Sequence, residues 1–274
     1  MPDQEFAHVN GVDLAYQIEG QGPVVVLLHS GIADSRMWEA LFKDLVGHYR
    51  VLRYDRRGFG RSPAVSGEFS HTADLLAMLK QLDLSQVALV GSSSGGSLAL
   101  DFALAYPDWV GALVLAGASP GGFSAVGDDP PQWEALVAAY QAGNFELAAE
   151  LEVQIWVDGP QRTPAEVDPT VRDLVCRMDV IALRNEASGL LQELPPKRKA
   201  IEHLDELRMP ALIIYGELDD PNMVRAAQLF VERMPHTRRL AFPGAAHFPN
   251  LEQPQIFNQA VLAFLGEVLL DPQA

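Results

Sequence analysis

Hydrophobic positions along this chain follow two spacings. Short continuous runs rich in valine, leucine and isoleucine are typical of strands buried on both faces of a parallel sheet. Between them, apolar residues recur every three or four positions, which predicts helices. The runs fall at 24–28, 51–54, 87–90, 112–115 and 211–215, with a weaker one at 238–242, and the helical stretches at 38–46, 71–82, 97–106, 223–233 and 255–269. This alternation predicts a mostly parallel sheet with right-handed crossovers and helices on both faces.

The beginning of the chain has the pattern of a β-hairpin. Two strand-like segments, 6–9 and 12–16, flank Asn10 and Gly11. Such a pair accepts the positive φ angles of a tight hairpin turn. Together with the six runs, the hairpin predicts an eight-stranded sheet in a fold of the α/β class.

Strand-like runs are missing between about residues 120 and 208. The segments 132–141, 146–157, 169–183 and 190–204 all have helical periodicity. A helical insertion between two strands is best interpreted as a cap over one edge of the sheet. We therefore predict a core domain formed by 1–119 and 209–274, with 120–208 as an inserted helical cap.

The strongest chemical motif follows the run at 87–90, where Gly91, Ser93 and Gly95 form Gly-x-Ser-x-Gly directly before a helix. A strand, this motif and a helix together are typical of a nucleophile elbow, whose serine has a strained backbone and small neighbours. Ser92 and Ser94 also carry hydroxyls, but only Ser93 has glycines at both flanking positions. Ser93 is therefore the predicted nucleophile.

A serine nucleophile needs a base, and the chain has seven histidines. His247 lies in a loop after the last predicted strand, at the sheet edge where sites of open α/β folds collect. His29 also follows a strand, but it precedes a turn and suits a structural or oxyanion-loop role better. We predict His247 as the base.

The base needs a carboxylate that fixes its tautomer. Asp219 and Asp220 both follow the run at 211–215. We choose Asp219, with Asp220 as the alternative because one residue of register separates them. The order serine, aspartate, histidine along the chain is that of α/β-hydrolases.

The negative oxygen of a tetrahedral intermediate needs backbone N–H donors. One is expected from Ser94, the residue after the nucleophile, and the other from the loop at 29–32. We assign the second donor to Gly31, with Ile32 as the alternative.

Taken together, these motifs closely resemble the α/β-hydrolase fold superfamily, and its esterase and enol-lactonase-like branch in particular. The resemblance also rests on the segment 54–62 and on Glu252 behind His247. It implies Ser93, Asp219 and His247 as the triad and a structural role for the turn at 55–62. Members usually carry glycine where this chain has Ser30. Related dehalogenases and epoxide hydrolases have aspartate at the elbow, so serine here implies acyl transfer to water.

Composition narrows the range of partners. The formal net charge of −16 disfavours nucleic acid and anionic membranes as partners. No metal-ligand cluster, phosphate loop or dinucleotide fingerprint appears in the sequence, so we expect no cofactor and no metal. The segment 1–6 lacks the pattern of a secretory signal, which favours a cytoplasmic protein. The sequence does not indicate the oligomeric state.

The expected function is a serine hydrolase that cleaves a small or medium, largely apolar carboxylic ester or lactone through an acyl-enzyme. As a group, apolar side chains of the cap are expected to line its pocket; they are Phe123, Trp133, Tyr140, Phe145, Trp156, Met178 and Leu183. Two alternatives stay open. One is a carbon–carbon bond hydrolase with the same triad, and the other is a ligand-binding receptor with a hydrolase fold.

Overall fold

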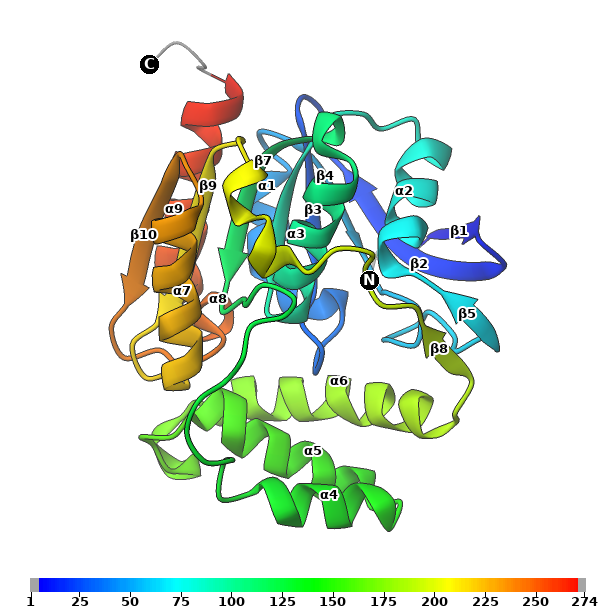
Figure 1. Cartoon of the computed structure of the whole chain (residues 1–274). Coiled ribbons are helices and arrows are strands. Elements are labelled where there is room, and N and C mark those ends of the chain that lie inside the picture. Colours follow the sequence, from blue (N-terminus) through cyan, green and yellow to red (C-terminus); the bar gives the residue numbers. More distant parts are fainter. Residues whose placement is uncertain (1–4, 271–274) are drawn as a thin grey trace.

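Eight strands form one sheet in the computed structural model, which describes residues 5–270 (Figure 1). Their order across the sheet is β1-β2-β4-β3-β6-β7-β9-β10. The pairs β1/β2 and β2/β4 are antiparallel and the remaining pairs are parallel. The strands are β1 (Glu5–Val9), β2 (Val12–Glu19), β3 (Val24–Leu28), β4 (Arg50–Tyr54), β6 (Val87–Ser92), β7 (Val110–Ala116), β9 (Ala211–Gly216) and β10 (Thr237–Phe242). The predicted eight-stranded, mostly parallel sheet is confirmed.

The hairpin turn between β1 and β2 has the backbone that its sequence predicts. Asn10 has a φ of 47° and Gly11 a φ of 77°. Two positive φ angles in a two-residue loop match the right-handed twist of the strands. Residues 1–4 lie outside the described residues, and with them most of the segment inspected for a secretory signal.

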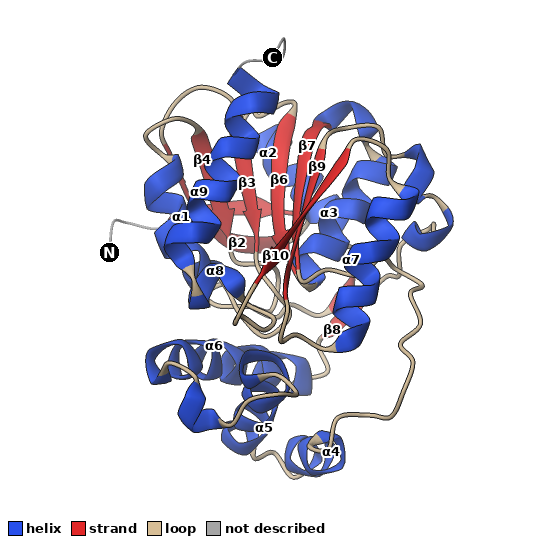
Figure 2. Ribbon diagram, turned by 90° about the vertical axis from the view of Figure 1, so that its left-hand side faces the viewer, coloured by secondary structure: helices blue, strands red, loops and turns tan. Residues whose placement is uncertain are grey.

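Helices cover both faces of the sheet (Figure 2). On one face, α2 (His71–Gln81), α3 (Ser94–Ala105) and α7 (Pro221–Arg233) bury Leu75, Leu98 and Phe230 in one apolar cluster. On the other, α1 (Glu39–Leu45) and α9 (Pro254–Leu265) bury Leu41 and Phe257 in a second. The sheet therefore lies between two apolar layers, which hold its strands in place. Among the described residues 5–270, none of the helices has the length and apolarity needed to cross a bilayer.

Three helices form a further layer beyond the carboxyl ends of the parallel strands, at the bottom of Figure 1. These cap helices are α4 (Trp133–Gln141), α5 (Phe145–Val153) and α6 (Pro169–Ala187), and α5 continues into a π-helical turn, Gln154–Asp158. They share a small apolar cluster with Leu136, Ala148 and Leu183 at its centre. Our division of the chain at 119/120 and 208/209 stays a prediction.

The helix predicted at 190–204 is wrong. Leu191–Glu193 form strand β8, which pairs in parallel with β5 (Gly67–Phe69), and only Ala200–Glu202 form a short 3₁₀ turn. Pro195 and Pro196 explain the difference, because proline lacks the N–H that a helix interior needs and disfavours helical backbone in the residue before it. The small β5/β8 sheet ties the chain after the cap helices to the core.

Short turns and helices complete the fold. Asn185 at the end of α6 donates a 2.8 Å hydrogen bond from Nδ2 to the carbonyl of Gly58, so the cap layer also contacts the turn after β4.

The remaining elements are α8 (Pro249–Glu252), the 3₁₀ turns Ser35–Trp38, Pro107–Trp109, Pro164–Glu166 and Leu204–Glu206, and a π-helical turn at Gly266–Leu270.

Candidate active site

The turn between β6 and α3 holds Ser93 in a strained backbone, with φ 51° and ψ −121°. A non-glycine residue in such a region costs about 1–3 kcal/mol and is typical of functional sites. The flanking glycines are required by close backbone contacts: a Cβ on Gly91 would lie 2.4 Å from the Gly95 carbonyl oxygen, and one on Gly95 2.2 Å from that of Leu28. The Ser93 N–H donates to the carbonyl of Ala116 at 2.8 Å. The sequence thus forms a sharp turn that raises Ser93 at the carboxyl edge of the sheet.

The loops after β9 and β10 bring Asp219 and His247 together. Nδ1 of His247 lies 2.9 Å from Oδ2 and 3.1 Å from Oδ1 of Asp219, and both side chains are buried. Asp220 instead caps α7, where its carboxylate accepts a 2.7 Å hydrogen bond from the N–H of Asn222. Between the two neighbouring aspartates, only Asp219 contacts the histidine.

The ring of His247 is enclosed by aromatic side chains and by the strand next to the elbow. Its centroid lies 4.7 Å from that of Trp156, in the π-helical turn after α5, and 5.1 Å from that of Phe248. A Cβ on Gly117 would lie 3.1 Å from Nδ1, and Gly117 directly follows the residue that accepts the Ser93 N–H. Ser93 and His247 therefore lie at the same edge, although no hydrogen bond joins their side chains in this structure.

The loop after β3 packs against the start of α3. A Cβ on Gly31 would lie 3.3 Å from Oγ of Ser94, so the two candidate oxyanion residues are in contact. Gly31, Ile32 and Ser94 line one wall of a cavity of about 440 Å³, which we call the site pocket. Both Gly31 and its alternative Ile32 border this pocket.

Arg56 is a buried cation that also lines the site pocket. Its Nη2 donates to the hydroxyl of Ser94 at 2.9 Å and to the carbonyl of Ser30 at 3.0 Å. Burial lowers the pKa of Arg56 to about 10, so the guanidinium stays charged at neutral pH. The backbone N–H of Arg56 donates to Nε2 of His29 at 2.9 Å, and burial also holds the pKa of His29 well below its usual range. A neutral His29 with both ring nitrogens engaged is structural.

The turn at 55–62 is therefore structural only in part. Asp55 accepts hydrogen bonds of 2.9 Å from the N–H groups of Ser35 and Arg61, and Arg57 pairs with Asp74 at 3.0 Å. These contacts fold the turn, as expected. The sequence interpretation missed Arg56, which uses the same turn to reach the site.

The pocket wall contributed by the cap helices is acidic rather than aromatic. Of the seven apolar cap residues expected there, only Leu183 borders the site pocket, next to Glu152, Asp179 and Glu186. Tyr140 instead packs on Phe145 within the cap layer, with ring centroids 6.0 Å apart. Trp156 packs on His247, as described above. Sequence reasoning missed the acidic residues because charged positions on a helix usually face solvent.

A model of the alpha/beta hydrolase family matches residues 25–260, from β3 through the cap helices into α9. The chain belongs to this family. Similar curated proteins match this chain along most of their own length. With its relatives named as esterases and hydrolases, the protein is a hydrolase.

Two curated relatives and one solved structure illustrate the similarity. The hydrolase is 30% identical over 252 residues to a pimeloyl-[acyl-carrier protein] methyl ester esterase of Aeromonas hydrophila, covering 90% of this chain and 97% of that one. It is 30% identical over 262 residues to a 2-hydroxy-6-oxononadienedioate/2-hydroxy-6-oxononatrienedioate hydrolase of Burkholderia vietnamiensis, covering 91% and 90%. The crystal structure of a hydrolase from Pseudomonas aeruginosa superposes with a TM-score of 0.79 at 27% identity, covering 97% and 99%.

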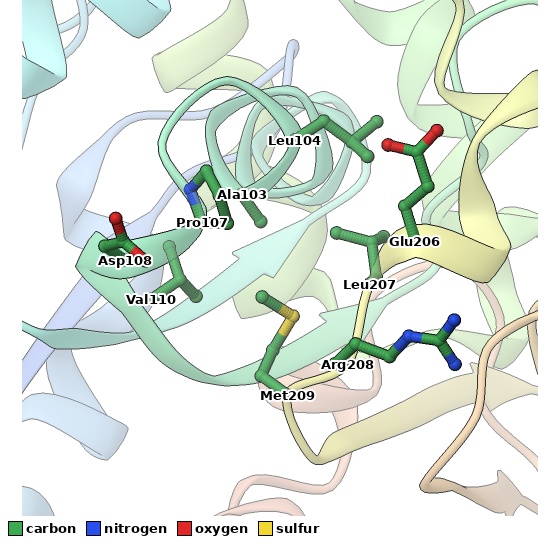
Figure 3. Close-up of a pocket in the computed structure, with 9 residues that line it drawn as sticks. All are labelled: Ala103, Leu104, Pro107, Asp108, Val110, Glu206, Leu207, Arg208 and Met209. Atoms are coloured by element: carbon green, nitrogen blue, oxygen red, sulfur yellow. The ribbon is translucent and has the colours of Figure 1, made fainter.

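A second pocket of the hydrolase, of about 350 Å³, lies at the opposite edge of the sheet (Figure 3). Val110 in its wall is the first residue of β7, whereas Ser93 follows the last residue of β6. Asp108, Glu206 and Arg208 give this pocket its charges. It is therefore separate from the elbow and from the paired Asp219 and His247.

Proposed function

We propose that this hydrolase cleaves a carboxylic ester or lactone of small or medium size through an acyl-enzyme on Ser93. The Ser93 hydroxyl attacks the carbonyl carbon while His247 takes its proton, and Asp219 stabilises the resulting imidazolium. The negative oxygen accepts hydrogen bonds from the N–H groups of Ser94 and Gly31. His247 returns the proton to the leaving alcohol, and a water molecule activated by the same histidine releases the acid.

One observation carries this proposal. Ser93, strained in the turn of Gly-x-Ser-x-Gly, lies at the sheet edge where a buried carboxylate holds Nδ1 of a histidine at 2.9 Å. When Nδ1 of the imidazole donates its hydrogen to the carboxylate, Nε2 is free to accept the proton of a hydroxyl. General-base catalysis by a triad needs this tautomer.

Arg56 is a positioning residue in this mechanism. Through Nη2 it holds the hydroxyl of Ser94 and the carbonyl of Ser30, the residue before Gly31. Hydrogen-bond donors that are already in place stabilise a transition state without reorganising. The residues that hold these donors in place therefore affect the rate of the reaction. A buried positive charge nearby also favours the negative oxygen.

The relatives support ester cleavage and supply one competing reaction. The Aeromonas hydrophila protein is named as a methyl ester esterase, and the Burkholderia vietnamiensis protein as a hydrolase of 2-hydroxy-6-oxononadienedioate. Both relatives are 30% identical to this chain, so the second name makes cleavage of a carbon–carbon bond the alternative reaction. We further propose that the partner is a small molecule rather than nucleic acid, since the net charge is −16.

The test compares two serine variants on p-nitrophenyl butyrate and on a vinylogous 1,5-diketone. Ser93→Ala is expected to abolish release of p-nitrophenol while circular dichroism stays native. Ser92→Ala is the matched control, because that hydroxyl is buried one residue earlier. Full turnover by the Ser93 variant would contradict the proposal, and turnover of the diketone alone would favour the carbon–carbon hydrolase.

A further inference from the structure

Two carboxyl groups of the cap helices meet without a basic partner. Glu152 of α5 and Asp179 of α6, here called the acidic pair, lie within hydrogen-bonding reach of each other. Asp179 is 1% exposed. Neither Oδ2 of Asp179 nor Oε2 of Glu152 has a hydrogen-bond donor within the described part of the chain. Over the same residues, no lysine or arginine forms an ion pair with either group or with Glu186.

The acidic pair borders the site pocket, although Ser93 and His247 are not among the residues that line this pocket. Asp179, Ala182, Leu183 and Glu186 follow the spacing of a single helix face, and all four line the site pocket. The same pocket is also lined by the candidate oxyanion residues Gly31, Ile32 and Ser94. Glu152 precedes Trp156, which packs on His247, by one helical turn.

Such an arrangement is costly unless something compensates it. Burying a carboxylate without a partner is strongly unfavourable, and two adjacent carboxylates repel each other. Burial raises the pKa of Asp179, and so does the neighbouring charge of Glu152. The cations of the pocket do not relieve this, because Arg57 is paired with Asp74 and Arg56 binds Ser94 and Ser30. A bound proton removes this cost at low pH, and a bound cation would offset it where the pair ionises.

We infer that the acidic pair binds a primary ammonium group on the substrate, at the end of the acyl chain remote from the ester carbonyl. An ammonium offers three donors, which suit the free oxygens of Asp179 and Glu152. Charge-assisted hydrogen bonds of this kind are about twice as strong as neutral ones. The substrate class is then an ω-amino ester. This inference rests on the proposed ester hydrolysis and specifies its substrate.

Three methyl esters of nearly equal length test the inference near neutral pH. Methyl 6-aminohexanoate is cationic, methyl heptanoate neutral and monomethyl adipate anionic. We expect kcat/KM for the amino ester to exceed that for the heptanoate by about tenfold or more, with the adipate slowest. Shorter and longer amino esters, each with its alkyl counterpart, locate the optimum chain length. An amino ester that is cleaved no faster than its alkyl counterpart at every length would overturn the inference.

Variants then assign the preference to the acidic pair. Asp179→Asn and Glu152→Gln should each lower the ratio of kcat/KM for amino ester over alkyl ester by about tenfold. Asp173→Asn is the control, since it removes the same charge from an exposed position on the same helix. A ratio that is equal in the Asp179 variant and in the control would exclude a role for the pair.

A binding measurement separates this inference from the proposed function. Calorimetric titration of the Ser93→Ala protein with hexylammonium should give a binding heat that 1-hexanol does not give and that Asp179→Asn removes. If no ester is cleaved but this binding is found, the proposed function fails and the ammonium site stands. If esters are cleaved but hexylammonium does not bind, the ammonium site fails alone.

Discussion

The guanidinium of Arg56 donates a 2.9 Å hydrogen bond to the hydroxyl of Ser94, the residue after the proposed nucleophile. The same nitrogen also holds the carbonyl of Ser30, so one buried side chain joins the elbow to the loop after β3. Ser94 supplies one of the two N–H groups proposed to bind the oxyanion. Gly31, which supplies the other, directly follows Ser30. The geometry of the proposed oxyanion site therefore depends on Arg56 as well as on the two N–H groups.

Arg56→Lys tests this dependence. Lysine keeps the charge but lacks the planar fork that reaches both acceptors. We expect kcat to fall by about tenfold, less than the 10²–10³ typical of removing an oxyanion donor itself, while KM changes little. Steady-state kinetics measure both constants, and thermal denaturation measures stability. A variant that loses stability but keeps kcat would show that Arg56 only supports the fold.

Asp219→Asn should separate the triad aspartate from its neighbour. The asparagine side-chain amide would favour the wrong tautomer of His247. The corresponding change in serine proteases with a Ser-His-Asp triad lowers kcat by about 10⁴-fold. Asp220→Asn is the matched control, because Asp220 only caps α7. It should keep kcat near that of the native protein. Equal losses in the two variants would contradict the assignment.

Gly95→Ala should destabilise the elbow. Its new Cβ would lie 2.2 Å from a backbone oxygen of β3, which cannot move as a flexible side chain would. We expect the free energy of unfolding to fall by about 3 kcal/mol, with loss of activity. Gly47→Ala, where a Cβ meets nothing within 4 Å, should change it by less than about 0.5 kcal/mol. Chemical denaturation followed by fluorescence checks both values.

The acidic pair predicts how stability depends on pH. Burial raises the pKa of Asp179 and of Glu152 in the folded state above that of the unfolded chain. Raised groups stabilise the fold fully at low pH, and this contribution is lost as the pH rises above about 4 and through the raised values. One linked proton gives a slope of about 1.4 kcal/mol per pH unit. Besides the pair, the charged and titratable groups that line the site pocket are Glu186, Glu193, Arg56, Arg57 and His71.

Asp179→Asn should therefore flatten the decline. Burial lowers the pKa of His29 and of His71, and these groups add stability as the pH rises in both proteins, so the test is the difference between the two. The free energy of unfolding of the native protein minus that of the variant should fall as the pH rises above about 4. The Asp173→Asn control should follow the native curve. A difference that stays constant or rises would show that the pair is ionised and compensated in the fold.

The sheet and the elbow were predictable because each rests on a local pattern. Buried strands require continuous apolar runs, and the backbone at Ser93 requires glycine at Gly91 and Gly95, so both leave a direct trace in the sequence. The choice of Asp219 over Asp220 was open until the loop conformation was known. That choice depends on a contact with His247, 28 residues further along the chain.

Other features were not predictable because they depend on contacts between distant segments. The strand at 191–193 pairs with β5, which is distant in the sequence, so this pairing is visible only in the fold, although Pro195 and Pro196 already disfavour a helix there. Arg56 lies beside a structural arginine of the same turn, and only the fold shows which of the two reaches Ser94. Glu152 and Asp179 sit on helices where most acidic residues face solvent, so their burial appears only when the cap helices are placed over the sheet.

The central claim is that one hydroxyl, that of Ser93, is activated at the edge of the sheet. Labelling with a fluorophosphonate, followed by mass spectrometry of the peptides, tests it most directly. We expect a single modified residue, Ser93, with labelling abolished in Ser93→Ala and strongly slowed in His247→Ala. A label on another residue, or unchanged labelling of the Ser93→Ala protein, would contradict it.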